Sequence, residues 1–165
     1  CSSDLRKIVD PFYQLVTQSD LKAFTWIREN VPADARFAVN GFLAFGDTVV
    51  VGSDAGWWLP FYTKREATVP PILYSTEALP QTMARTFFRQ FVIDVRDSQG
   101  EPLRLRQALC QAAITHLFLG EKQGRVGVGS QPLIPAEWLE QDSDFRLLDS
   151  EGHAQVWGFD RAVCS

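Results

Sequence analysis

One stretch of the chain combines aromatic rings with positive charges: Trp57, Trp58, Phe61, Tyr62, Lys64 and Arg65. Such rings stack on the faces of sugars and also collect at membrane interfaces, where a ring with one polar edge is well solvated. The same residues can equally fill a core. Adjacent helical residues point about 100° apart, so Trp57 and Trp58 cannot both lie at the centre of one buried stripe. We expect at least one of them to serve binding.

A second stretch, residues 120–129, has four glycines and two cations, Lys122 and Arg125. Backbone N–H groups and cations of this kind can cradle a phosphate or another anion. The glycine order matches neither a Walker loop nor the dinucleotide fingerprint. A plain surface loop after a strand is the alternative interpretation.

Residues for bond-making chemistry are scarce. His116 and His153 are the only histidines, and no spacing typical of metal ligands includes them. Ser53 does not stand at the centre of a nucleophile elbow, so with Asp54 we expect it to cap a helix. Asp94 and Asp97 are interpreted as solvated. The sequence therefore predicts no catalytic residue, no metal and no cofactor.

Elements that position these residues follow from hydrophobic periodicity and turn signals. A valine-rich strand over 48–52 precedes a helix that begins at 53 or 54 and is broken or restarted at Pro60. Ligands often bind at such a strand-to-helix edge of an open α/β sheet. The other expected helices are 19–31, 76–95, 102–113 and 136–141, and the other expected strands are 36–40, 67–69, 115–119, 145–148 and 154–159, the last two as a hairpin.

Composition limits the class of protein. The 165 residues are 45% hydrophobic, which is enough for one globular domain with a real core. The pattern predicts an α/β fold, a single three-layer-like domain with a mixed sheet and a C-terminal β-hairpin. A net charge of -4 argues against nucleic acid as a partner. A locally basic middle is interpreted as a solvated helical face: Arg85, Arg89, Arg96, Arg104 and Arg106.

The ends and the cysteines give weaker signals. No apolar run has the roughly 18 residues of a membrane span, and the first residues form no signal peptide. The chain begins without Met, so we expect a piece of a longer protein. Cys110 lies in a helical pattern and is predicted to be a small core residue. A bridge between Cys1 and Cys164 is left open, because an odd count of three cysteines cannot all pair.

Three segments carry a resemblance to a known family. They are 20–35 (DLKAFTWIRENVPADA), 51–60 (VGSDAGWWLP) with Arg65 and the following Pro70-Pro71, and 116–124 (HLFLGEKQG). Together they resemble the C-terminal soluble extracytoplasmic domains of bacterial multi-pass GT-C type membrane glycosyltransferases, similar to protein mannosyltransferases. The likeness spans about residues 20–160. The Trp-Trp stretch is its distinctive part, whereas the first segment is generic.

The resemblance implies that catalysis belongs to a transmembrane part of the protein and not to this chain. In that family the transmembrane part carries the catalytic aspartate and uses a polyprenyl-phosphate sugar, so no catalytic residue transfers to this chain. Residues 1–18 would be a membrane-proximal lead-in, and 19–165 a soluble domain tethered at the extracytoplasmic face of the bacterial membrane. Its partners would be its own transmembrane domain and a membrane surface or lipid-linked sugar. The expected contact residues are Trp57, Trp58, Arg65, Lys122 and Arg125.

Two other classes of function stay open on the sequence alone. One is a stand-alone small α/β hydrolase or nucleotide-binding enzyme. The other is a structural or interaction module whose aromatic residues are core. Full burial of both Trp57 and Trp58 would remove the basis for sugar stacking.

Overall fold

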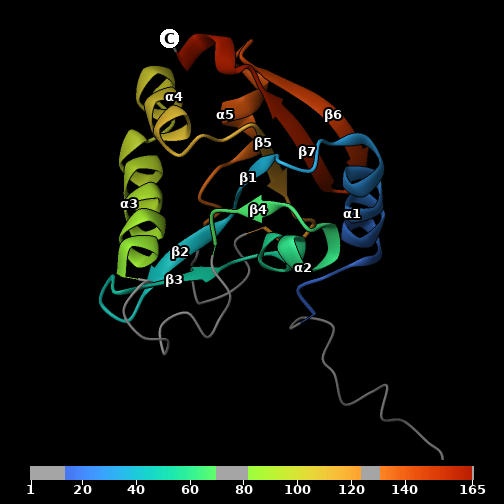
Figure 1. The fold of residues 1–165 in the computed structure, drawn as a ribbon, viewed down its shortest axis with the longest axis horizontal. Coiled ribbons are helices and arrows are strands. Elements are labelled where there is room, and N and C mark those ends of the chain that lie inside the picture. Colours follow the sequence, from blue (N-terminus) through green and yellow to red (C-terminus); the bar gives the residue numbers. More distant parts are fainter. Residues whose placement is uncertain (1–13, 70–81, 124–130, 165) are drawn as a thin grey trace, which may run out of the picture.

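The computed structural model describes residues 14–69, 82–123 and 131–164. Helices and short strands alternate through most of the chain and a β-hairpin comes near its end (Figure 1). In chain order the elements are α1 Gln18–Asn30, β1 Arg36–Val39, β2 Gly41–Ala44, β3 Val49–Gly52, η3 Ala55–Trp58, α2 Leu59–Thr63, β4 Glu66–Ala67, α3 Thr82–Ser98, α4 Pro102–Gln111, β5 His116–Leu119, α5 Ala136–Glu140, β6 Phe145–Glu151, β7 Ala154–Phe159 and η6 Arg161–Cys164.

The main sheet has five strands in the order β4-β1-β5-β7-β6. Strands β4, β1 and β5 are parallel, whereas β7 is antiparallel to both β5 and β6. The carboxyl ends of the parallel strands therefore meet at one edge of the sheet, next to η3 and α2. This is the predicted single α/β domain with a mixed sheet and a C-terminal hairpin.

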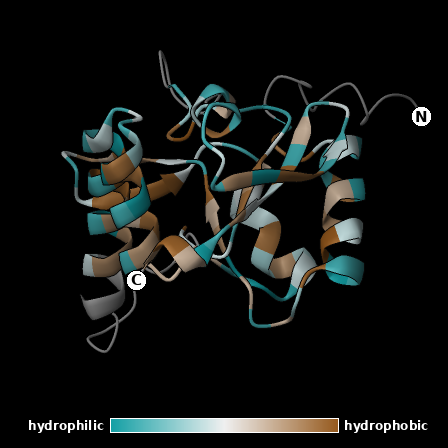
Figure 2. Cartoon of the chain, turned by 90° about the horizontal axis from the view of Figure 1, so that it is seen from above, coloured by the Kyte–Doolittle hydropathy of each residue, from teal (hydrophilic) through white to brown (hydrophobic). Residues whose placement is uncertain are grey.

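Helices cover the sheet from two sides. Helix α1 packs against β6 and β7, and its Phe24 ring lies 5.1 Å from that of Phe118 in β5. Helices α3 and α4 pack together on the opposite side of the molecule (Figures 1 and 2). Apolar side chains from both helical groups and from the strands join in one buried core.

Local sequence signals explain where α1 begins and ends. Thr17 and Asp20 form a capping box at its start, because each side chain binds the backbone N–H of the other. Its last residue precedes Val31, whose extended backbone leads into Pro32, a residue that cannot continue the helical hydrogen bonding.

The valine-rich strand departs from the expected arrangement. Strand β3 forms as predicted, but it pairs only with β2, a strand that the sequence analysis missed, in a separate two-stranded sheet. The chain turns between them through Phe45, Gly46 and Asp47, which all have positive φ. The expected helix over 76–95 is observed as α3, and its predicted first residues lie outside the described part of the chain.

The expectation that Cys110 is a small core residue is wrong. Cys110, at the end of α4, forms a disulfide with Cys164 in η6, so it is not a simple core residue. The same bond excludes a Cys1–Cys164 bridge. Periodicity places Cys110 on the buried side of its helix, but it cannot reveal a partner that follows 54 positions later.

We predict that Cys110→Ser lowers the free energy of unfolding by about 2–4 kcal/mol, because the bond closes a long loop in the unfolded chain. Denaturant titration under oxidising conditions measures the change. The matched control is the Cys110→Ser/Cys164→Ser double variant, whose stability should not respond to added reductant, while that of the wild type falls. Equal stability of wild type and single variant would contradict the prediction.

Candidate functional site

A buried carboxylate organises the edge where the parallel strands end. Asp54 has no exposed surface and caps η3, accepting hydrogen bonds from Asn40 Nδ2 at 3.1 Å, Gly56 N at 2.8 Å and Gly120 N at 2.9 Å. These donors come from the end of β1, from η3 itself and from the end of β5. One side chain therefore joins the ends of β1 and β5 to η3.

Asn40 extends this polar centre in two further directions. Its Oδ1 accepts a hydrogen bond from Ile134 N at 3.0 Å, and its backbone O accepts one from Ser53 N at 3.2 Å. The residue is fully buried, so each of these bonds compensates a group removed from water. Asn40 thus fixes the segment before α5 to the same edge as η3.

Asp20 plays a parallel part at the start of α1. Its carboxylate accepts hydrogen bonds from Thr17 N at 2.8 Å, Thr17 Oγ1 at 2.9 Å and Glu121 N at 2.9 Å. Two consecutive amides after β5, those of Gly120 and Glu121, are therefore held by two different buried aspartates. Burial raises the pKa of Asp20, and burial also raises the pKa of Asp54 from 3.8 to about 6.

The two tryptophans have different surroundings. Trp57 is partly buried and packs against the core, close enough to Gly52 that a Cβ added there would lie 2.5 Å from the Trp57 Cβ. Trp58 points outward with 48% of its surface exposed. The expectation that the pair would not both be core is confirmed.

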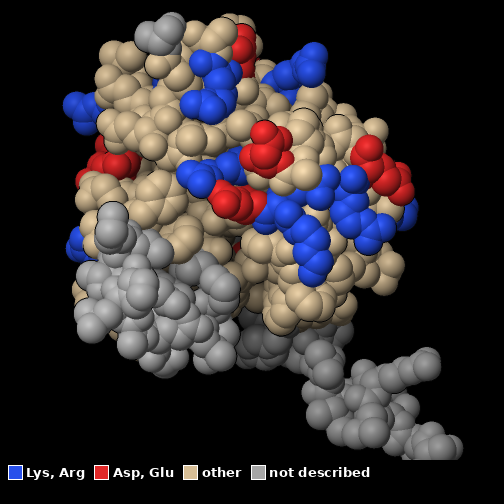
Figure 3. Space-filling model, in the orientation of Figure 1, with Lys and Arg blue, Asp and Glu red and all other residues tan. Residues whose placement is uncertain are grey.

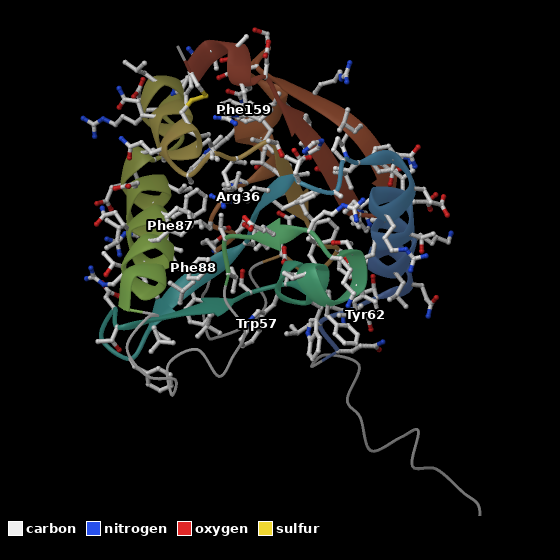
Figure 4. All side chains as sticks on the ribbon, in the orientation of Figure 1. Arg36, Trp57, Tyr62, Phe87, Phe88 and Phe159 are labelled. Carbon is white, nitrogen blue, oxygen red and sulfur yellow. A yellow bond between two sulfur atoms is a disulfide. The ribbon has the colours of Figure 1, made fainter. Side chains whose placement is uncertain are left out.

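Three exposed rings lie on the outer side of η3 and α2: Trp58, Phe61 and Tyr62, together called the α2 aromatic face. Tyr62 is held in place by stacking on the buried Phe24 ring at 5.3 Å, and Phe61 meets Tyr62 edge to face at 5.2 Å. Lys64, which ends α2 in the left-handed conformation, places its Nζ 5.4 Å from the centre of the Phe61 ring. Figure 4 shows Tyr62 near the beginning of α1 and Trp57 on the same end of the molecule.

The Arg65 side chain has a structural role. Its guanidinium donates hydrogen bonds to the backbone oxygens of Arg28, Val31, Pro32 and Thr63. Three of these carbonyls lie at the end of α1, where helical carbonyls lack internal partners. The side chain therefore has a structural task that sequence reasoning missed, because its four acceptors are backbone atoms.

The glycine-rich stretch is described only over 120–123, which forms a turn after β5. Lys122 Nζ donates to the backbone O of Gln14 at 2.7 Å, so this cation lies beside the segment that enters α1. Arg125, the other cation expected to bind an anion, lies outside the described residues. The structure brings Trp57, Trp58 and Lys122 to the same edge of the sheet, since η3 and the turn after β5 are joined by Asp54.

The remaining chemical candidates are structural or at the surface. Ser53 is buried without a hydrogen-bond partner for its Oγ, so Asp54 alone caps η3, contrary to the expected pair. His116 Nδ1 lies 2.8 Å from Thr115 Oγ1, in line with an ordinary strand residue. Asp94 accepts a hydrogen bond from Gln90, and Asp97 accepts one from Arg96, on the surface of α3. Within the described ranges, no three histidine, cysteine, aspartate or glutamate residues gather as a metal site.

Comparison with known proteins identifies one informative similarity. The sequence matches no protein-family model and no curated protein. Among solved structures, the C-terminal globular domain of an oligosaccharyltransferase from Archaeoglobus fulgidus is similar, with a TM-score of 0.53 and 12% sequence identity. The match covers 87% of this chain and 98% of that domain. The chain has the fold of that domain. At this identity the similarity concerns the fold alone.

We predict that the buried Asp54 makes folding depend on pH. A folded-state pKa of about 6, above the unfolded value, means that the folded protein binds the proton more tightly between these two values. Wild-type stability should therefore fall by about 2 kcal/mol from this group as the pH rises from 4 to 7. Urea titrations of wild type and Asp54→Asn across this range isolate the effect, because the variant has no group to ionise there.

The stability difference, wild type minus Asp54→Asn, should shrink with rising pH. The variant should nevertheless be less stable than wild type at pH 4. The amide nitrogen of the new asparagine is itself a donor, so it cannot accept the hydrogen bonds that the Asp54 carboxyl group accepts. The control is Asp34→Asn, which removes a carboxylate from an exposed position and so accounts for the loss of one carboxylate as such. A difference between wild type and Asp54→Asn that is independent of pH would contradict the assignment.

Proposed function

We propose that this chain is the extracytoplasmic domain of a bacterial membrane glycosyltransferase that uses a lipid-phosphate-linked sugar, and that it positions the acceptor or the donor without making bonds itself. The observation that carries the proposal is the shared fold with an oligosaccharyltransferase domain over 98% of that domain's length. The three sequence segments that resemble membrane glycosyltransferases support it independently. In this proposal residues 1–18 lead from the membrane-embedded part to the domain.

The disulfide supports the proposed location. Bonds such as Cys110–Cys164 form and persist in oxidising compartments and are rare in the reducing cytosol. The described residues contain no helix with the length and apolar character to cross a bilayer. In this proposal the membrane anchor belongs to the proposed partner, the transmembrane domain of the same protein.

The edge at which the parallel strands end is the proposed contact surface. Trp58 offers an exposed ring to a sugar face, and Trp57 supports it from the core side. Lys122 and Arg125 supply positive charge for a phosphate. Arg65 contributes by binding the carbonyls at the end of α1 and the carbonyl of Thr63 at the end of α2, which holds these two helices together. This exposed edge favours a binding role over a module whose aromatic residues are all core.

The test uses the full-length protein with its transmembrane part, in membranes supplied with a radiolabelled lipid-linked sugar. We expect Trp58→Ala and Arg125→Ala each to lower sugar transfer by about tenfold, as for loss of one positioning contact. Leu103→Ala is the matched control, because it removes an exposed apolar side chain from α4, and its transfer rate should equal that of wild type. The isolated 165-residue chain should transfer no sugar.

Unchanged transfer by both Trp58→Ala and Arg125→Ala would overturn the assigned contacts. Turnover by the isolated chain would overturn the noncatalytic role and would support the stand-alone enzyme. Protein levels in the membrane, measured by immunoblot, ensure that a lower rate does not reflect a loss of protein.

A further inference from the structure

Exposed apolar side chains are concentrated on one turn of the chain. Among the described residues six large hydrophobic side chains are exposed, and three of them fall within the five positions 58–62. Phe61 is 66% exposed, Trp58 48% and Tyr62 37%. Scattered exposed hydrophobic residues need no explanation, but a contiguous group indicates a surface that is covered in the working protein.

The geometry keeps these three rings on one side. Positions i, i+3 and i+4 of a helical segment share a face, and 58, 61 and 62 have this spacing. Stacking of Tyr62 on Phe24 anchors this face to the core. Phe61, the most exposed of the three rings, lies at the outer part of this face with Lys64 beside it.

The chain enters the domain on the same side. Lys122, in the turn next to η3, binds the backbone of Gln14, and Thr17 Oγ1 donates to Glu121 Oε2 at 2.5 Å. The α2 aromatic face and the incoming segment are therefore both attached to the turn that follows β5, through Asp54 and Asp20 respectively. Figure 4 shows the same proximity, with Tyr62 near the first turn of α1.

Charges around the α2 aromatic face have the sign that an anionic surface requires. Lys64 and Arg65 follow it directly, although the whole chain has a net charge of -4. Figure 3 shows Lys and Arg side chains gathered over α1, α2 and β4, with a few acidic side chains between them. A lysine whose stem crosses an aromatic ring can keep its ammonium group in the headgroup layer while the ring lies deeper.

We propose that the α2 aromatic face lies in the interfacial layer of a lipid bilayer, with Trp58 and Tyr62 at headgroup depth, Phe61 deeper and Lys64 against lipid phosphates. This mixture of rings and cation is the composition that membrane interfaces select. One exposed turn is also far smaller than the roughly 800 Å² per partner of a stable protein interface. The orientation toward the membrane rests on the proposed function, whereas the affinity for lipid does not.

The first experiment measures partition of the chain onto sugar-free vesicles of phosphatidylcholine and phosphatidylglycerol by cosedimentation. We expect Trp58→Ala/Phe61→Ala to lower the partition coefficient by about tenfold, from the lost burial of two rings. The matched control is Leu103→Ala/Leu147→Ala, which removes two other exposed apolar side chains and should bind as wild type. Circular dichroism and melting temperature show whether each variant is folded.

A second measurement does not depend on a truncated side chain. The chain is tethered through an N-terminal His tag to vesicles with a nickel-chelating lipid, and brominated lipids quench tryptophans that enter the bilayer. Wild-type fluorescence should be quenched, and Trp58→Phe should remove the quenched component although it retains the other four tryptophans.

The outcomes separate this proposal from the proposed function. The membrane contact would be overturned if the wild-type chain neither bound vesicles nor showed quenching. Equal binding by both double variants would overturn it as well. Neither result would decide whether the protein takes part in sugar transfer. Loss of sugar transfer in Trp58→Ala with normal vesicle binding would instead assign that ring to the sugar and overturn its place in the bilayer.

Discussion

The hydrogen bonding of the buried Asp54 carboxylate is the interaction on which this edge of the molecule depends. A carboxylate removed from water is costly unless its oxygens are satisfied, and here three donors from separate segments satisfy them. The cost of burial appears in its raised pKa, and the gain is geometric. A donor that moved away would leave an unpaired group in the interior. The ends of β1 and β5 and the start of η3 are therefore held in one arrangement.

That arrangement determines which aromatic residues face inward and which face outward. Because Asp54 caps η3, the chain direction after β3 is fixed, and Trp57 then packs beside Gly52 while Trp58 turns to the surface. Arg65 completes the frame by binding the carbonyls at the end of α1. Rings on a rigid turn lose little conformational freedom when they meet a ligand or a lipid surface. The buried hydrogen bonds of Asp54 thus help to fix the position of the α2 aromatic face on the surface.

Sequence reasoning succeeded where the signal is local and failed where it depends on distant partners. Periodicity and Pro32 made α1 predictable, although its cap is Thr17 and not the expected Ser19 or Asp20, and the turn at 150–152 predicted the final hairpin. The valines of β3 indicated a strand but not that β2 is its partner, because any adjacent extended segment satisfies the same pattern. Asp54 was recognised as a cap, whereas its bond to Gly120 joins positions 66 apart. The acceptors of Arg65 are backbone oxygens, which every residue has, so the sequence does not indicate which residues Arg65 binds.

The segment that enters α1 lies near the α2 aromatic face, and this position affects how strongly so small a surface can bind a membrane. Free in solution, a domain with three exposed rings would meet a membrane weakly. If a short segment holds the domain at the bilayer, as we propose for residues 1–18, each further contact becomes an intramolecular event at high effective concentration. The linkage of Gln14 to Lys122 keeps the incoming chain and the α2 aromatic face on the same side, so that both can meet one surface together. In the proposed arrangement, weak contacts would be sufficient to orient the domain and would still allow it to release and rebind.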